Sequence, residues 1–184
     1  MTQYRNIYIL LTDTGTLLNR MIKLYTGASL NHASISLDGS LQQVYSFGRK
    51  DQNDPWVGGF VREDLRGELL SSSKCAIYQL RVTARQYENL KSVIRTFELN
   101  EQQYSYNLLG LLFLACHIPL KRKRAFFCSE FVAYALSRAG IELIDKPASL
   151  VKPCDFAKSP DLKLVYEGEV SDYLELGRSA ERVS

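Results

Sequence analysis

One stretch in the second half of the chain limits most strongly what the chain can fold into. Residues 126–136 read FFCSEFVAYAL, and the apolar side chains after the cysteine recur at the spacing of a helix buried along one face. Arg138 in the last turn and Gly140 as a C-terminal cap predict where this helix ends. We therefore expect a buried helix that begins at Cys128 and forms part of the core.

The position of Cys128 gives this residue its chemical interest. At a helix N-terminus, unpaired backbone N–H groups and the helix dipole favour an anion, and so favour a thiolate over a thiol. The thiolate is the nucleophilic form of cysteine. Cys128 is therefore a candidate nucleophile, although a small cysteine buried only for packing would give the same local pattern.

Size and charge narrow the class of protein. The 184 residues are 46% hydrophobic, enough for one well-packed domain, and no shift in composition divides the chain. We predict a single domain over residues 1–172 and a flexible tail over residues 173–184. The net charge of +3 is mild and favours neither a dedicated nucleic-acid binder nor a strongly acidic partner.

The cysteines and the apolar runs predict a cytoplasmic protein. The four cysteines show no CxxC spacing, and the first residues lack the long apolar core of a signal peptide. The longest apolar run, residues 108–120, is interrupted by His117 and Pro119. It is too short to cross a bilayer, which takes roughly 20 residues. We therefore expect a reducing cytosol and no transmembrane anchor.

Several segments carry the period of a strand or of a helix. Alternating or β-branched apolar residues predict strands, and apolar residues at helical spacing predict helices. The predicted strands are 4–11, 31–37, 44–47, 60–61, 75–80 and 162–166. The predicted helices are 14–25, 83–100, 108–116 and 128–138, and the second of these begins with a capping box.

Two histidines are candidates for a base beside Cys128. A cysteine hydrolase needs a base within hydrogen-bond reach of the sulfur, and histidine serves near neutral pH. His117 stands in an apolar stretch, where a packed or helix-end histidine is the ordinary interpretation. His32 begins a strand of alternating apolar and polar residues, so it lies on the polar face beside small serines. By itself, His32 is also typical of a partly exposed strand histidine without a task.

Two short motifs, taken in order, resemble a known family. Residues 31–36 (NHASIS), followed much later by residues 127–132 (FCSEFV), resemble the circularly permuted papain-like cysteine hydrolases of the YiiX type, in the NlpC-type superfamily. In that group the histidine strand precedes the cysteine helix. The resemblance implies an α+β fold with an antiparallel sheet packed against helices. It also implies Cys128 at a helix N-terminus as the nucleophile and His32 as the base.

The resemblance leaves the third catalytic residue open. Such families usually place a polar side chain on the strand after the histidine, where it orients the imidazole. Here that strand offers Gln43, Tyr45 and Ser46, and we favour Tyr45 from its place in the motif. If none of these reaches His32, a carbonyl or a water must orient the ring. Tyr106, before the cysteine motif, is a candidate to line the substrate site, or else a tyrosine at the edge of the core.

A basic run separates the apolar segment from the cysteine motif. It comprises Lys121, Arg122, Lys123 and Arg124. Such a run can make a weak contact with an anionic membrane, at roughly 1 kcal/mol per basic residue, or it can be a solvated loop between two helices. Four basic residues without an aromatic platform do not predict nucleic-acid binding.

The pattern of potential ligands does not predict a metal site. Cys116 and His117 are neighbours, and neighbouring residues on one helix point about 100° apart. No familiar zinc spacing links them to Cys128. We expect neither a metal nor another cofactor.

Together these features predict a cysteine-dependent hydrolase, of amidase, peptidase or thioesterase type, or an acyltransferase. Cys128 would attack an amide or ester carbonyl to form an acyl-enzyme, with His32 as the base. The substrate is a small molecule, a lipid-like molecule or a peptide, since the resemblance does not fix it. The alternative is a non-catalytic module of the same fold that binds lipid or a membrane surface. A weaker alternative is a partner protein whose groove holds a peptide.

Overall fold

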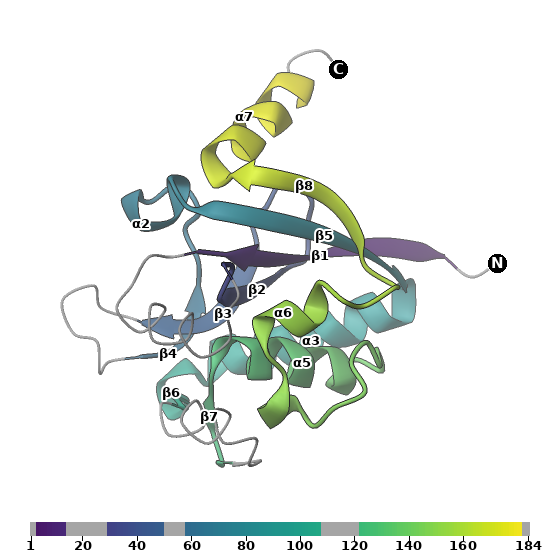
Figure 1. Cartoon of the computed structure of the whole chain (residues 1–184). Coiled ribbons are helices and arrows are strands. Elements are labelled where there is room, and N and C mark those ends of the chain that lie inside the picture. The colour runs from purple at the N-terminus through teal and green to yellow at the C-terminus, as the bar shows by residue number, and fades with distance from the viewer. Residues whose placement is uncertain (1–2, 14–28, 50–57, 108–121, 182–184) are drawn as a thin grey trace.

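The structure is a computed structural model that describes residues 3–13, 29–49, 58–107 and 122–181 (Figure 1). Over these residues the chain has an α+β fold in which helices pack on a six-stranded antiparallel sheet. The α+β class and the antiparallel sheet predicted from the sequence are thus confirmed. Two of the predicted helices, at 14–25 and 108–116, lie outside the described residues.

The six strands follow the order β4-β3-β2-β1-β5-β8 across the sheet. Their bounds are β1 Tyr4–Thr12, β2 His32–Ser36, β3 Val44–Arg49, β4 Gly58–Arg62, β5 Lys74–Thr83 and β8 Lys163–Glu169. Central β1 pairs with β2 in a register that places Thr12 opposite His32, at the end of the ladder. A separate parallel pair joins β6 (Ser105–Tyr106) to β7 (Ala125–Phe126).

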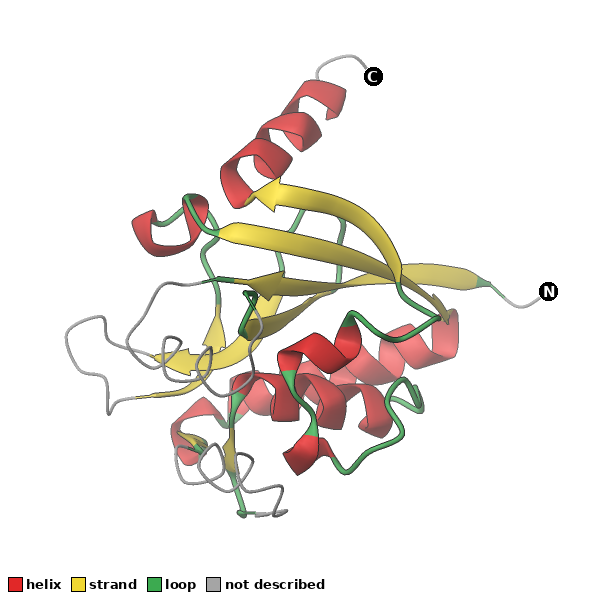
Figure 2. Ribbon diagram, in the orientation of Figure 1, coloured by secondary structure: helices red, strands yellow, loops and turns green. Residues whose placement is uncertain are grey.

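Helices cover both faces of the sheet (Figure 2). They are α2 Glu68–Ser71, α3 Ala84–Leu99, α5 Cys128–Arg138, α6 Pro153–Phe156 and α7 Val170–Glu181, with short 3-10 turns at Glu101–Gln103 and Ala148–Leu150. Figure 2 shows α3, α5 and α6 on one side of the sheet and α2 and α7 on the other. Within the described ranges no helix combines the length and the apolar character needed to span a membrane.

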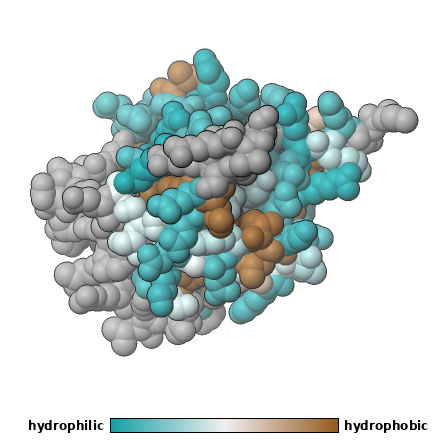
Figure 3. All heavy atoms as spheres, turned by 90° about the horizontal axis from the view of Figure 1, so that it is seen from above, coloured by the Kyte–Doolittle hydropathy of each residue, from teal (hydrophilic) through white to brown (hydrophobic). Residues whose placement is uncertain are grey.

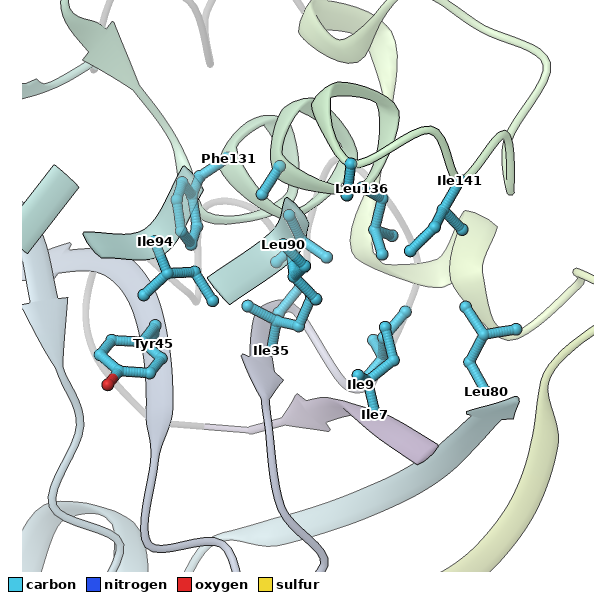
Figure 4. Close-up of a cluster of buried hydrophobic side chains, with 14 of the residues drawn as sticks. Ile7, Ile9, Ile35, Tyr45, Leu80, Leu90, Ile94, Phe131, Leu136 and Ile141 are labelled. Atoms are coloured by element: carbon cyan, nitrogen blue, oxygen red, sulfur yellow. The ribbon is translucent and has the colours of Figure 1, made fainter. Parts of the chain in front are cut away.

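The sequence of β1 explains why both faces are covered. Its residues Ile7, Ile9 and Leu11 enter the larger core cluster with residues of α3 and α5 (Figure 4), whereas Leu10 enters a smaller cluster with residues of α2 and α7. Successive side chains of a strand point to opposite faces. A strand that is apolar at consecutive positions must therefore be buried on both sides.

Aromatic packing fixes α5 against the sheet and against α3. The ring centroid of Phe131, from α5, lies 5.2 Å from that of Phe47 on β3 and 5.1 Å from that of Phe97 on α3. All three rings are buried. Because Phe131 is one turn from the start of α5, this contact also fixes where Cys128 lies.

The ends of the helices follow the sequence closely in two cases. Thr83 and Gln86 form the predicted capping box at the start of α3. Gly140 follows α5 with a φ of 78°, a left-handed conformation that glycine adopts without strain, as its predicted role as a cap requires.

The C-terminal segment differs from its prediction. Residues 173–181, predicted to belong to a flexible tail, lie in α7, and the Tyr173 hydroxyl donates a hydrogen bond to the Gly39 carbonyl at 2.9 Å. The reason is tertiary, because Tyr173 and Leu174 pack against the smaller core cluster. Figure 3 shows this side of the molecule, where hydrophobic patches lie among mostly hydrophilic side chains.

Candidate active site

Cys128 is the first residue of α5, as the sequence predicts. Phe127 precedes it in an extended conformation and serves as the N-cap. The Cys128 side chain is buried, with 2% of its surface exposed. Because the helix that follows is packed along one face, the sulfur is held at a fixed place beside β2, against which α5 lies.

His32 lies beside Cys128, although 96 positions separate the two in the sequence. His32 is the first residue of β2, and its ring lies close enough to the Cys128 thiol for each group to shift the pKa of the other. The structure thus brings together the two residues that the sequence singled out. His32 is also largely buried, so this pair is shielded from bulk water.

The third member of the group is Glu63, which the sequence analysis missed. Its Oε1 atom lies 2.6 Å from His32 Nε2, and its Oε2 atom accepts a hydrogen bond of 2.6 Å from the Ser34 hydroxyl. The Glu63 backbone N–H donates to the Val44 carbonyl at 2.9 Å, which holds the residue directly after β4. With Nε2 engaged by Glu63, the other ring nitrogen of His32 is left for the sulfur of Cys128.

Tyr45 does not occupy the orienting position that we predicted for it. The register of β2 and β3 places Tyr45 opposite Ile35, and its ring packs in the core, 5.9 Å from the ring centroid of Phe60 (Figure 4). Burial and the nearby Glu98 of α3 raise the pKa of the Tyr45 hydroxyl. The side chain that contacts His32 therefore comes not from the strand after the histidine but from Glu63, at the end of the next strand.

The other two candidates on that strand are engaged or positioned elsewhere. The Ser46 hydroxyl donates to the Ala33 carbonyl at 2.8 Å. Gln43 is exposed at the turn, where its backbone N–H donates to Asp38. The only sequence signal for Glu63 is an acidic residue at the end of a short extended segment, which is too common a pattern to single it out.

The charges of this group reinforce one another. Burial alone lowers the pKa of His32, but the neighbouring Glu63 carboxylate and Cys128 thiolate, with hydrogen bonds to both, raise this pKa well above its ordinary value. Burial alone raises the pKa of Cys128, but the His32 charge and hydrogen bonds from His32, Ala33 and Ser129 lower it. Both shifts favour a thiolate paired with an imidazolium.

Tyr106 lies close enough to Cys128 to share its electrostatic environment. It is half-buried on β6, and β6 pairs with β7, which leads directly into Cys128. Gly58 lets β6 pack closely against β4, because a Cβ atom at position 58 would lie 2.8 Å from the Tyr106 Cβ atom. Burial and the charges of Cys128 and Glu130 raise the pKa of Tyr106 well above its ordinary value, so its hydroxyl keeps its proton.

Comparison with known proteins adds no relative from which a role could be transferred. No protein-family model and no curated protein matches the sequence. The site itself offers a buried sulfur, an imidazole beside it, and a carboxylate hydrogen-bonded to the imidazole.

The basic run and the other cysteine and histidine candidates lie partly or wholly outside the described residues. Arg122, Lys123 and Arg124 are exposed, and Lys121 lies outside the described residues, so membrane contact stays a prediction. Cys116 and His117 also lie outside them. Among the residues that the structure describes, no three of His, Cys, Asp and Glu are grouped so as to hold a metal ion.

Proposed function

We propose that this chain is a cysteine-dependent hydrolase or acyltransferase that cleaves an amide or ester bond. The observation that carries the proposal is the series formed by Cys128, His32 and Glu63, in which His32 lies beside the thiol and its Nε2 atom is 2.6 Å from Glu63 Oε1. A nucleophile, a base and a group that orients the base are the parts that covalent acyl transfer requires.

In the proposed reaction, the Cys128 thiolate attacks the substrate carbonyl carbon and forms a tetrahedral intermediate. Backbone N–H groups at the start of α5 stabilise its oxyanion. The His32 imidazolium then gives its proton to the leaving amine or alkoxide, the carbon–heteroatom bond breaks, and a thioester on Cys128 remains. Water or an acceptor amine, deprotonated by His32, attacks the thioester and releases the product and the thiolate.

Glu63 and Tyr106 have distinct roles in this proposal. Glu63 orients the imidazole and compensates its positive charge, so it takes the place that we had assigned to Tyr45. Tyr106 lines the substrate site, where a hydroxyl that keeps its proton can donate a hydrogen bond to the substrate. No cofactor is required for any of these steps.

The order of the parts supports the finer fold assignment. The histidine strand β2 precedes the cysteine helix α5 in the chain, as in the permuted papain-like hydrolases of the YiiX type. We propose this fold and a cytoplasmic location for the chain. A small molecule, a lipid-like molecule or a peptide remains the proposed class of substrate.

The test is the rate of iodoacetamide labelling at Cys128 against pH, followed by peptide mass spectrometry in wild type and His32→Ala. Cys154, half-buried and part of α6, provides a reference thiol in the same digest. The pKa of an ordinary thiol is about 8.5. We expect Cys128 to label rapidly well below that pH, and to lose this behaviour in His32→Ala. An ordinary thiol profile that His32→Ala leaves unchanged would contradict the proposal.

A further inference from the structure

The first turn of α5 is capped in an unusual way. An N-cap side chain usually accepts hydrogen bonds from the free N–H groups of the first turn, but Phe127 at this position has no acceptor. Instead, the carboxylate of Glu130, three residues later, accepts a hydrogen bond from the Phe127 N–H at 3.3 Å. The capping hydrogen bond is thus accepted by the third residue of the helix and donated by the residue before Cys128.

Helix α3 of the same chain provides a direct comparison. There Thr83 accepts from the Gln86 N–H at 3.2 Å, and Gln86 accepts from the Thr83 N–H at 2.9 Å. Both halves of the capping box are present in α3. Only the half made by the side chain at the third helical residue is present in α5, so no N-cap side chain occupies the N–H groups that follow Cys128.

Glu130 also connects three separate segments. Its Oε2 atom accepts a second hydrogen bond, at 3.3 Å, from the Asn107 side-chain amide, while the Asn107 N–H donates to the Phe126 carbonyl at 2.8 Å. Glu130 is 4% exposed and Asn107 is fully buried. One buried carboxylate oxygen therefore joins the residue after β6, the residue after β7 and the first turn of α5.

From this arrangement we infer that Glu130, with Asn107 as its partner, is a positioning residue for Cys128. Its hydrogen bonds hold the residue before the cysteine in place and leave the Ser129 N–H, directly after the cysteine, to the thiolate and to an oxyanion. The Ser129 N–H, beside the sulfur, is one of the groups that lower the pKa of Cys128. The inference rests on the proposed function and assigns to it a residue outside the series of Cys128, His32 and Glu63.

The charge of Glu130 separates this role from an electrostatic one. The charged or titratable groups around Cys128 in the described part of the chain are His32 from β2, Glu63 beyond it, Tyr106 from β6 and Glu130 itself. A carboxylate two residues from the sulfur disfavours a thiolate. If Glu130 helps the nucleophile, it does so through its hydrogen bonds, and not through its charge.

Three variants test the inference through the pH at which Cys128 alkylation by iodoacetamide is half-maximal. Glu130→Gln keeps an acceptor oxygen and removes the charge, so the half-point should stay at the wild-type pH or fall below it. Glu130→Ala removes the hydrogen bonds, so the half-point should rise by at least about one pH unit toward that of an ordinary thiol. Asn107→Leu leaves Glu130 with one donor fewer and should give a smaller rise, and it replaces Glu130→Ala if that variant does not fold.

A matched control removes the same kind of hydrogen bond elsewhere. Gln86→Ala deletes the equivalent cap of α3, near the opposite end of α5, where Gln86 donates to the Gly140 carbonyl. It should lower the melting temperature without moving the half-point. If the wild-type thiol is activated but the pH of half-maximal alkylation is unchanged in Glu130→Ala and Asn107→Leu, this inference alone is overturned. The same holds if that pH rises equally in Glu130→Gln and Glu130→Ala. An ordinary wild-type profile would overturn the proposed function as well.

Discussion

His32 and Cys128 shift each other's pKa, and this gives the site a defined working range. The raised pKa of His32 means that its contribution to stability is fully present below the unfolded value of about 6.5 and is lost as the pH rises through the folded value. The lowered pKa of Cys128 has the opposite sign. Its contribution is present above the unfolded value of about 8.5 and is lost as the pH falls through the folded value. The charged pair is therefore populated between these two folded pKa values.

Glu63→Gln should lower the upper limit of the pH range in which the charged pair of Cys128 and His32 is populated. The substitution removes a charge that raises the pKa of His32, so the alkaline limb of the acylation rate with an activated ester should move to lower pH. The rate at the optimum should fall by about 10² to 10⁴, as expected when an orienting group is lost. Stopped-flow measurement with p-nitrophenyl acetate over roughly pH 5 to 10 covers the ordinary pKa values of His32 and Cys128. It gives both the position of the alkaline limb and the rate at the optimum.

The matched control for Glu63→Gln is Ser34→Ala. It removes only the hydrogen bond to the second oxygen of Glu63 and leaves the charge in place. Its effect on the rate should be smaller, and its alkaline limb should stay close to that of the wild type. An alkaline limb that Glu63→Gln leaves unmoved would show that Glu63 does not set the charge of His32.

At this scale the sequence identifies some residues of the site and not others. Cys128 stands out because a helix start is visible in the residues around it, and His32 because it begins an alternating strand. Glu63 has no such local signature. Its role depends on where β4 ends relative to β2, which is a property of the sheet and not of the residues near position 63.

Among the elements, α5 is held against the sheet and α3 by aromatic packing. The ring of Phe131 contacts the rings of Phe47, Phe60 and Phe97, and is itself fully buried. These partners come from two strands and from α3. The same residue therefore contributes to the stability of the fold and to the position of Cys128 one turn away.

Phe131→Ala should lower the free energy of unfolding by roughly 3–5 kcal/mol, because it leaves a cavity at the centre of this cluster. Urea denaturation followed by far-UV circular dichroism measures the loss. Leu99→Ala, at the end of α3, is the control, because Leu99 is 72% exposed and its truncation should change stability by less than about 0.5 kcal/mol. Similar losses in the two variants would contradict the assignment of Phe131 to the core.

The elements that can be predicted from the sequence are those whose own apolar residues recur with a strong helical or strand period. The capping box and helical spacing of α3 are visible in its own sequence, and both are confirmed. Helix α7 was missed because its stability comes from contact with distant residues, such as the hydrogen bond from Tyr173 to Gly39, 134 positions away. The pattern of residues within one segment does not reveal a contact with a distant segment.

At the scale of the whole molecule, the two faces of the sheet carry different core clusters. The face covered by α3 and α5 carries the larger core, beside which Cys128 and His32 meet, whereas the face covered by α2 and α7 carries the smaller cluster. The sheet order β4-β3-β2 also decides the site, because it brings the end of β4 within reach of the first residue of β2. Neither arrangement can be read from one segment alone.

Because the two faces are distinct, α7 should matter for stability more than for the reactivity of the thiol. A chain that ends at residue 172, the predicted domain boundary, loses Tyr173 and Leu174 from the smaller cluster. Burial of two such side chains, both only partly buried, and one hydrogen bond predict a loss of roughly 2–5 kcal/mol in the free energy of unfolding.

The comparison is with a chain that ends at residue 181 and keeps α7 whole. Urea denaturation should give a lower midpoint for the shorter chain, while the pH profile of Cys128 alkylation, measured without urea, should be the same for both. Equal midpoints would show that α7 contributes nothing to the fold. A shifted alkylation profile in the shorter chain would show instead that the two faces are coupled, and that the sheet transmits changes at α7 to the pair formed by Cys128 and His32.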